Sequence, residues 1–410
     1  MGYQQGLSGL AASSNDLDVI GNNIANANTV GFKQSTAQFA DVYANTIATS
    51  VGNQIGLGAS LQTVQQDFAQ GTINTTGQAL NVAINGNGFF QMSNNGSITY
   101  SRNGVFQLNK NGYITDASGN DLMGYAADST GVVNTAQTVP LQVPTTNIAP
   151  VATTKVTAQV NLNAQATTIP ATSTFDPNDS TTYSYSTSIT GYDSLGGKQQ
   201  INLYYVQTAT GTAEVYGGVA GGTMTDLGAM NFGTSGTLTG TSGGTSGANN
   251  TFTLTINPTD GSATGQKITI DVSGTTQYGS ANGVNNLAQD GYPSGTLSNF
   301  SIGADGTITG NYSNGQTMAL GQIVLANFNN PNGLVNLGGN QFQETSASGV
   351  AQVSTPGSTN HGTLTGGALE SSNVDLTNQL VDLITAQRNY QANAQTIKTQ
   401  QTVDQTLLQM

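Results

Sequence analysis

The chain is 410 residues long, enough for two to four domains, and only 7% of its residues are charged, against a usual value of about 25%. Its 8 Lys and Arg against 21 Asp and Glu give a net charge of −13, which excludes nucleic acid and anionic membranes as partners because both would repel it. Without cysteine, the chain has no disulfide, no thiolate metal site and no Cys nucleophile. Gly, Asn, Gln, Ser and Thr dominate, which predicts polar β structure.

The sequence offers little for catalysis. Its single histidine, His361, lies on a Gly-rich stretch, where we expect it to be solvated. The carboxylates are scattered and assemble no acid/base pair, so we expect no cofactor, no metal and no enzymatic activity. A glycosidase needs only two carboxylates, and this reading stays open as a weak alternative.

The composition is typical of an extracellular protein, yet the usual targeting signals are not found. No apolar run reaches the roughly 18 residues of a membrane span, so we expect no membrane insertion. The first basic residue is Lys33, so the N-terminus has no basic region of an ordinary signal peptide. Both observations predict export by a route that leaves the N-terminus uncut.

A helical pattern runs along residues 3–28. The apolar residues on one side of this pattern are Tyr3, Leu7, Leu10, Leu17, Ile20 and Ile24. Gly6, Gly9 and Gly21 each weaken an isolated helix by up to about 1 kcal/mol, but they permit another helix to approach closely. We therefore expect this helix to need neighbours.

The next segments predict β structure. Residues 34–70 read as an extended connector with short strands. In residues 81–125, Asn-Gly pairs recur at 87, 95, 103 and 111 with alternating apolar residues between them. Asn-Gly favours tight hairpin turns and alternation marks half-buried strands, so this segment is predicted to be a β-meander. It belongs to an inner β domain of residues 71–145 and 293–360.

Residues 146–292 are predicted to be an inserted outer β domain, bounded by prolines on both sides. Alternating apolar residues predict one hairpin around the sequence YDSLGGK and a second between residues 251–256 and 267–272. Residues 217–250 are rich in Gly, Ser and Thr, and we expect a mobile loop there.

Residues 373–410 contain neither Gly nor Pro and show helical periodicity. One stripe steps by four and three residues, as in a coiled-coil seam, through Leu376, Leu380, Leu383, Gln387, Tyr390, Ala394 and Ile397. Residues 371–373 offer N-cap oxygens, and Asp375 would lie in the first turn. After Ile397 the stripe drifts towards Val403 and Leu407. A helix of about 55 Å needs a partner, and we hypothesise that it is ordered only when other copies supply one.

Two amphipathic helices at the ends of a β-rich chain predict that the termini meet. The expected fold class is α+β, mainly β, with antiparallel, coiled-coil-like terminal helices and two successive β-rich domains, the outer inserted in the inner. Residues 1–33 with 366–410 would form a helical polymerisation domain, although two ordinary surface helices remain an alternative. The predicted assembly residues are Leu7, Leu10, Leu17, Ile20, Ile24, Leu376, Leu380, Leu383, Tyr390, Ala394, Ile397 and Leu407.

Three stretches resemble the bacterial flagellar axial family of rod, hook and hook-associated proteins. They are NNIANANTVGFK at residues 22–33, INGNGFF at 84–90 and LESSNVDLTNQLVDLITAQRNYQANAQTIKT at 369–399. The resemblance is strong at both ends and weak across the inserted domain. Its signature positions in this chain are Asn22, Asn23, Asn26, Asn28, Gly31, Phe32, Lys33, Gln387, Arg388, Tyr390 and Asn393.

The resemblance is greatest to hook members of the family, and it implies a structural subunit. Such a subunit would assemble with its own copies into a flexible tube outside the cell, linking rod to filament and transmitting torque. The implied partners are rod, hook-cap and hook–filament junction proteins and the flagellar type III export apparatus. A distal rod protein is the main alternative, and a β-rich surface adhesin is a weaker one.

Overall fold

The computed structural model describes residues 2–42, 56–170 and 172–409. The chain divides into two compact units. The first comprises Met1–Thr145, Asn299–Asn311 and Thr317–Met410, and the second comprises Thr146–Ser298 and Tyr312–Gln316. The first unit therefore contains both ends of the chain, and most of the second is one continuous insertion.

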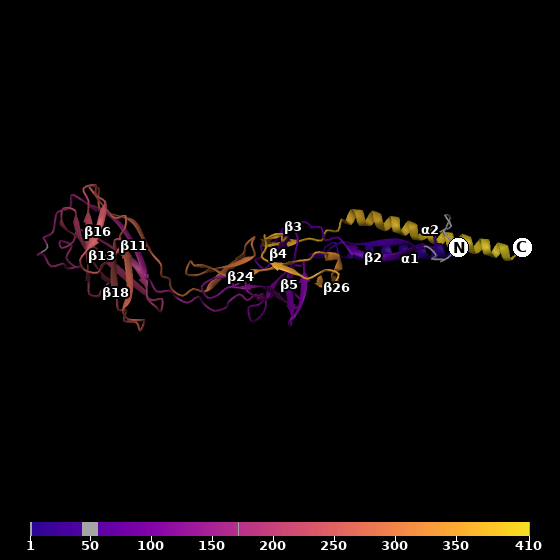
Figure 1. Cartoon of the computed structure of the whole chain (residues 1–410), viewed down its shortest axis with the longest axis horizontal. Coiled ribbons are helices and arrows are strands. Elements are labelled where there is room, and N and C mark those ends of the chain that lie inside the picture. Colours follow the sequence, from indigo (N-terminus) through magenta and orange to yellow (C-terminus); the bar gives the residue numbers. More distant parts are fainter. Residues whose placement is uncertain (1, 43–55, 171, 410) are drawn as a thin grey trace. The chain divides into compact units, whose positions relative to one another are not determined.

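Two long helices, α1 (Gly2–Ala25) and α2 (Leu376–Leu408), lie side by side and antiparallel (Figure 1). The start of α1 and the end of α2 lie at the same end of this pair. Apolar residues recur at helical spacing in both segments. The predicted pair of terminal helices in a mainly β fold is confirmed.

The start of α2 differs from the sequence expectation. The helix begins at Leu376, and its N-cap is Asp375, whose carboxylate accepts hydrogen bonds from two backbone N–H groups of the first turn at 2.9 and 3.2 Å. The prediction of a cap within residues 371–373 was wrong, because the Asn373 side chain bonds to backbone groups elsewhere in the first unit.

The segment expected as an extended connector forms a two-stranded antiparallel sheet. Its strands are β1 (Ser35–Val42) and β2 (Gly58–Gln66), with a register shift between Gln38 and Phe39. Both strands contact α1. The connector is thus paired with itself and packed on a helix, instead of running singly from one domain to the next.

Most of the remaining first unit is β structure. A 13-stranded sheet has the main strand order β22-β23-β24-β9-β5-β6-β27-β26. Five further strands of this sheet, β7, β8, β10, β25 and β28, pair outside that order. Two small sheets pair β4 with β29 and β3 with β30. An aromatic cluster of Phe89, Tyr100, Phe328 and Phe342 is buried there, with edge-to-face contacts such as Tyr100 on Phe328 at 4.8 Å between ring centroids. The bounds are β3 (Ile73–Thr75), β4 (Val82–Asn85), β5 (Phe89–Asn94), β6 (Ser97–Ser101), β7 (Gln107–Leu108), β8 (Ile114–Thr115), β9 (Asp121–Ala126), β10 (Val139–Pro140), β22 (Leu297–Ile302), β23 (Thr307–Tyr312), β24 (Thr317–Ile323), β25 (Leu325–Asn327), η1 (Pro331–Gly333), β26 (Val335–Gly338), β27 (Gln341–Gln343), β28 (Gln352–Ser354), β29 (Thr363–Gly366) and β30 (Ala368–Glu370).

Two of the four Asn-Gly pairs form the predicted turns, whereas Asn87-Gly88 and Asn103-Gly104 join no paired strands. Asn95 and Gly96 join β5 to β6 with φ of 50° and 93°, which is the backbone of a tight hairpin turn. Gly112, with φ of 82°, lies in the turn between β7 and β8. The prediction of one continuous meander was wrong, because β6 pairs with β27 and β9 pairs with β5.

The second unit contains two sheets around one apolar core. A six-stranded sheet has the order β17-β18-β19-β11-β20 with β21 on β11, and a five-stranded sheet runs from β12 to β16 in chain order. Both predicted hairpins, β12–β13 and β18–β19, are confirmed. Both sheets contribute core residues, among them Val160, Leu203 and Phe252. The bounds are β11 (Lys155–Asn163), β12 (Tyr185–Tyr192), β13 (Lys198–Ala209), β14 (Thr212–Val219), β15 (Thr225–Phe232), β16 (Leu238–Ser242), β17 (Ser246–Gly247), β18 (Thr251–Ile256), β19 (Gln266–Asp271), β20 (Thr276–Tyr278) and β21 (Gly283–Gln289).

The mobile loop expected over residues 217–250 was wrong. This segment contains β15, β16 and β17, and its Leu227 and Met230 side chains are fully buried. Gly221 and Gly236 adopt φ of 77° and 75° in the turns between strands. Glycine here supplies the turn conformations that other residues rarely adopt, so the glycine-rich composition marks short strands with tight turns.

Candidate functional site: the paired terminal helices and the charge cluster at their base

The two helices meet through small and polar side chains. Asn23 on α1 donates an Nδ2 hydrogen bond to Gln379 Oε1 on α2 at 3.0 Å, and both side chains are buried. Farther along, a Cβ added to Gly9 would lie 2.9 Å from the amide of Asn393. A larger residue at position 9 would therefore displace the Asn393 side chain from this close contact, as the glycines in the sequence suggested.

The α2 residues that face α1 recur every seven positions in the sequence. They are Gln379, Ala386 and Asn393. At about 100° per residue, the predicted apolar stripe is rotated from this side by roughly a quarter of a turn. Leu376 and Leu380 are consequently 47% and 46% exposed. Within one chain, polar and small residues of α2 make much of the contact with α1, and an apolar pattern cannot reveal them. That the stripe packs against other copies stays a prediction.

The predicted assembly residues fall into three groups by exposure. Ile20 is buried; Leu10, Leu17, Ile24, Leu383, Ala394 and Ile397 are half-buried; and Leu7, Leu376, Leu380, Tyr390 and Leu407 are exposed. The structure brings Ile397 against Gly6 of α1, whereas Leu407 lies in the last turns of α2, beyond the residues paired with α1.

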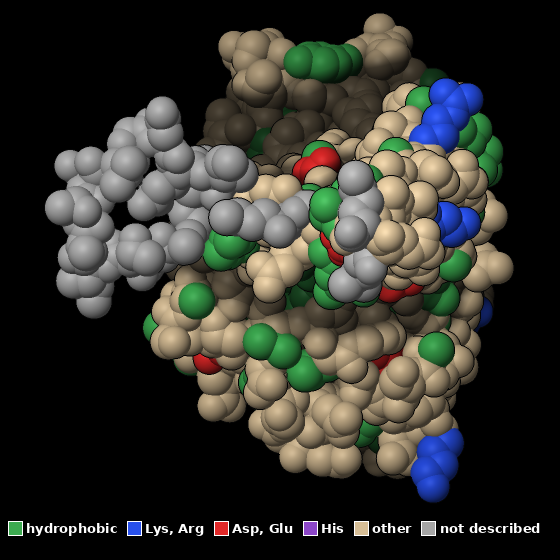
Figure 2. Space-filling model, turned by 90° about the vertical axis from the view of Figure 1, so that its right-hand side faces the viewer, with side chains coloured by type: hydrophobic (Ala, Val, Ile, Leu, Met, Phe, Trp, Pro, Cys, Tyr) green, Lys and Arg blue, Asp and Glu red, His purple; other side chains and the backbone are tan. Residues whose placement is uncertain are grey.

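The predicted stripe does not include two exposed apolar residues of α2. They are Val381 and Ile384, 58% and 51% exposed. Together with Leu376 and Leu380 they form what we call the outer apolar face of α2, turned away from α1. Figure 2 shows the end of the molecule where the helices end, and its surface is mostly uncharged, with apolar side chains scattered among polar ones.

A buried cluster of three charged residues lies where the helix pair joins the β structure of the first unit. Lys33 Nζ is 2.7 Å from Glu370 Oε1 and Arg102 Nη1 is 3.3 Å from Glu370 Oε2, with each side chain at most 3% exposed. Burial, assisted by the nearby Arg102, lowers the pKa of Lys33, while Glu370 opposes that shift. Burial also lowers the pKa of Arg102 against the attraction of Glu370. One carboxylate thus holds two cations, and we call these residues the charge cluster.

Backbone groups supply further hydrogen bonds to the charge cluster, although the buried Arg102 Nε has no partner among the described residues. Lys33 Nζ also donates to the Ala69 carbonyl at 2.8 Å, and the Gly71 N–H donates to Glu370 Oε1 at 2.8 Å. Arg102 Nη2 donates to a further carbonyl at 2.9 Å. Buried charges are tolerated only when they are paired and hydrogen-bonded in this way, so the chain segments that supply these groups are held together.

The end of the N-terminal signature packs directly on the charge cluster. Gly31 has φ of 69°, and a Cβ there would lie 2.8 Å from the Arg102 backbone. The Gly31 N–H donates to the Glu370 carbonyl at 2.9 Å. α1 ends at Ala25, so Gly31 lies beyond the helix and the helical pattern of residues 3–28 extended three residues too far. Phe32 is half-buried beside it.

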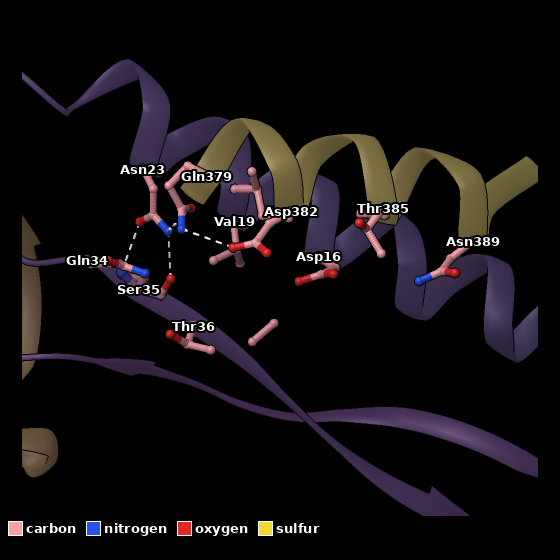
Figure 3. Close-up of a pocket in the computed structure, with 13 residues that line it drawn as sticks. Asp16, Val19, Asn23, Gln34, Ser35, Thr36, Gln379, Asp382, Thr385 and Asn389 are labelled. Carbon is pink, nitrogen blue, oxygen red and sulfur yellow. Dashed lines mark hydrogen bonds between the residues drawn. The ribbon is translucent and has the colours of Figure 1, made fainter. Parts of the chain in front are cut away.

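The asparagines of the signature have different roles. Asn23 fixes the start of β1, because its Nδ2 donates to the Ser35 carbonyl at 2.7 Å and its Oδ1 accepts from the Ser35 N–H at 2.9 Å (Figure 3). Asn26 donates to Asn22 Oδ1 at 2.6 Å and so stabilises the last turn of α1. Asn28 is exposed.

The signature positions on α2 lie mostly on the surface. Gln387, Arg388 and Tyr390 are exposed, and Asn393 donates to Ser13 Oγ on α1 at 3.4 Å. The structure therefore does not gather the two halves of the signature into one site. The N-terminal half lies at the charge cluster, and the C-terminal half lies along α2.

The partners of Lys33 were missed by the sequence reasoning. Arg102 and Glu370 are separated from each other by 268 residues, and no spacing rule connects them. A signal was nevertheless present, because Lys33 and Arg102 are two of only 8 cations in the chain.

A groove of about 270 Å³ lies between α1, α2 and the start of β1 (Figure 3). Asp16 of α1 and Asp382 of α2 both line it, with Thr36 and Asn389 on its other sides. Burial, assisted by the negative charge of Asp382, raises the pKa of Asp16. The groove is therefore a place where like charges of the two helices face each other.

The described residues bear on three further expectations from the sequence, for metal sites, for His361 and for membrane spans. In residues 2–42, 56–170 and 172–409, no group of three or more His, Asp or Glu side chains is placed to hold a metal ion. His361 is half-buried instead of solvated as expected, and its Nε2 lies 2.9 Å from the Gln352 carbonyl. None of the helices described is both long and apolar enough to cross a membrane.

Four family models match segments of the chain. They are the flagella basal body rod protein (residues 4–33), the flagellar hook protein FlgE/F/G D1 domain (83–172), the flagellar basal body protein FlaE D2 domain (161–292) and the flagellar basal body rod FlgEFG protein C-terminal (365–410). The matches include both helices and both β regions. They define the class of flagellar rod and hook subunits.

Relatives of known name specify the family further. The chain is 42% identical to flagellar hook protein FlgE of Salmonella typhimurium and 41% identical to that of Escherichia coli, each match covering 100% of both chains. It is 32% identical to the FlgE of Treponema pallidum over 99% of this chain and 98% of that one. The chain therefore belongs to the flagellar hook protein FlgE family.

The fold agrees with this family. The crystal structure of Helicobacter pylori flagellar hook protein FlgE2 superposes with a TM-score of 0.50 over 73% of this chain and 100% of that chain, at 15% identity. The family is a structural one, so the chain is a component of the flagellum outside the cell and not an enzyme. The rod protein and adhesin alternatives find no support among these relatives.

Proposed function

We propose that the chain is the repeating subunit of a flexible hook tube that links rod to filament and transmits torque as a universal joint. The family membership supports the hook assignment. The observation that supports self-assembly through the helices is the outer apolar face of α2, which α1 leaves exposed. Burying an exposed Leu or Ile contributes about 1 to 3 kcal/mol, so contact between copies would stabilise the helices.

Each region of the chain would have a separate structural role. Residues 1–33 with 366–410 form the polymerisation domain, residues 34–70 the connector, residues 71–145 with 293–360 the inner β domain and residues 146–292 the outer one. The charge cluster fastens the polymerisation domain to the inner β domain, so force applied to one reaches the other. The further partners proposed are the rod, hook-cap and hook–filament junction proteins and the type III export apparatus.

The test is a substitution in the outer apolar face. We expect Leu380→Asp to abolish tube formation by the full-length chain, because an unpaired charge buried between copies costs several kcal/mol. A loss of about 1.4 kcal/mol already raises the critical concentration tenfold. Tubes are counted by electron microscopy, and the critical concentration is measured by sedimentation.

The matched control is Val350→Asp, at an 82% exposed apolar position outside the helices. It should polymerise as the unsubstituted chain does. Circular dichroism must show that both variants keep their β structure. Normal tubes from Leu380→Asp would defeat the proposal that this face joins copies.

A further inference from the structure

The groove between the helices is lined by one carboxylate from each helix, Asp16 of α1 and Asp382 of α2. Figure 3 shows Asp16 and Asp382 pointing into the groove from opposite helices. The segment at the start of β1 adds Gln34, Ser35 and other uncharged residues, and none of the lining residues is basic. Neither helix therefore offers a cation to this pair of acids.

The available hydrogen bonds do little to offset the repulsion. Gln379 Nε2 donates to Asp382 Oδ2 at 3.4 Å, near the limit for a hydrogen bond, and Gln379 already accepts from Asn23. The free cations of α2, Arg388 and Lys398, do not line the groove. Asp16 is half-buried and Asp382 is exposed, so water screens part of the repulsion between the two carboxylates.

We propose that Asp16 and Asp382 make the helix pair sensitive to protons: the helices pack when one of the two carboxyl groups is protonated and loosen when both are ionised. The protonated carboxyl can donate a hydrogen bond to its neighbour or to the adjacent amides, whereas two carboxylates can only accept and repel. The contact lies within one chain and does not depend on the proposed function. Its consequence, weaker hook assembly at higher pH, rests on that function.

The sign of the pH dependence follows from linkage. The pKa of Asp16 is raised in the folded helix pair above its unfolded value of about 3.9. Below the unfolded value both states are protonated, and the groove is neutral. As the pH rises through the folded pKa, the folded pair must ionise against repulsion, and stability is lost. The helix pair is therefore most stable in mild acid.

The experiment is a set of thermal melts of the full-length chain, followed in the helical band of circular dichroism from about pH 4 to about pH 8. We expect the helical melting temperature of the unsubstituted chain to fall by several degrees across this range. Asp382→Asn and Asp16→Asn should each flatten this dependence and raise the melting temperature at neutral pH. The double variant should add little, because both substitutions remove the same repulsion.

The matched control is Asp18→Asn, an exposed acid on α1 that does not line the groove. It should retain the pH dependence of the unsubstituted chain. Melting that is independent of pH in the unsubstituted chain, or an unchanged dependence in both groove variants, would overturn the proposal. The proposal would also be overturned if neither the free chain nor the polymerised chain gave a helical signal. Failure of the chain to form tubes tests only the proposed function, since these melts need no polymer.

Discussion

The second unit and the helix pair bury apolar side chains to very different extents. In the second unit, two sheets enclose one continuous cluster that includes Tyr205, Phe252 and Ile270, all fully buried. In the described helices, the buried apolar side chains are Ile20 and Ala386 alone, beside the polar Asn23 and Gln379. A fully buried large apolar side chain contributes about 1.5 to 3 kcal/mol. The second unit can therefore fold on its own core, whereas the helix pair has apolar surface left for other copies.

This contrast predicts that the largest effect of a single substitution falls in the second unit. We expect Phe252→Ala to lower its free energy of unfolding by about 3 to 5 kcal/mol, because a cavity is left in a closed core. Urea unfolding of the full chain, followed by tyrosine fluorescence, measures this change. Leu195→Ala, at a 62% exposed position, should change it by less than about 0.5 kcal/mol. Equal loss of the helical signal in Phe252→Ala would show that the regions do not fold separately.

A slightly smaller effect is expected at the charge cluster, which joins the helix pair to the β structure. Glu370→Gln leaves Lys33 and Arg102 buried without a counter-charge, at a cost of about 3 kcal/mol. Because trypsin cleaves after Lys and Arg, cleavage after the now loosened Lys33 should become much faster than in the unsubstituted chain. The exposed Asp41→Asn serves as the control and should be cleaved at the original rate. Protection of Lys33 in Glu370→Gln would mean that backbone bonds alone hold the junction.

The smallest effect is expected at the start of α2. Asp375→Ala removes the side-chain acceptor for two N–H groups of the first turn, which costs about 1 kcal/mol of helix stability. The helical band of circular dichroism should melt at a lower temperature, with the β band unchanged. Asp375→Ser keeps a capping oxygen and should restore most of the loss. If Asp375→Ala melts like the unsubstituted chain, contacts between the helices, and not the cap, set the stability of this end.

Local sequence patterns predict most of the elements and some of their connections. The hairpin turn at Asn95 and Gly96 follows from the backbone that Asn-Gly favours, and the β12–β13 and β18–β19 hairpins follow from alternation on either side of a turn. The glycine-rich composition of residues 217–250 predicted a mobile loop. The segment instead forms short strands, and its glycines lie in the turns between them.

The sequence by itself determined the two terminal helices, the β-rich middle and the family signatures, because periodicity, turn chemistry and motifs depend on residues close together in the chain. Only the tertiary structure decided which side of α2 meets α1, and that Lys33 finds its carboxylate 337 residues away in Glu370. Polar contacts such as Asn23 with Gln379 leave no apolar periodicity, and a buried ion pair depends on where the fold brings two distant segments together. Leu376 and Leu380 of the outer apolar face were predicted from the sequence, but that α1 leaves them exposed beside Val381 and Ile384 could be recognised only once the position of α1 was known.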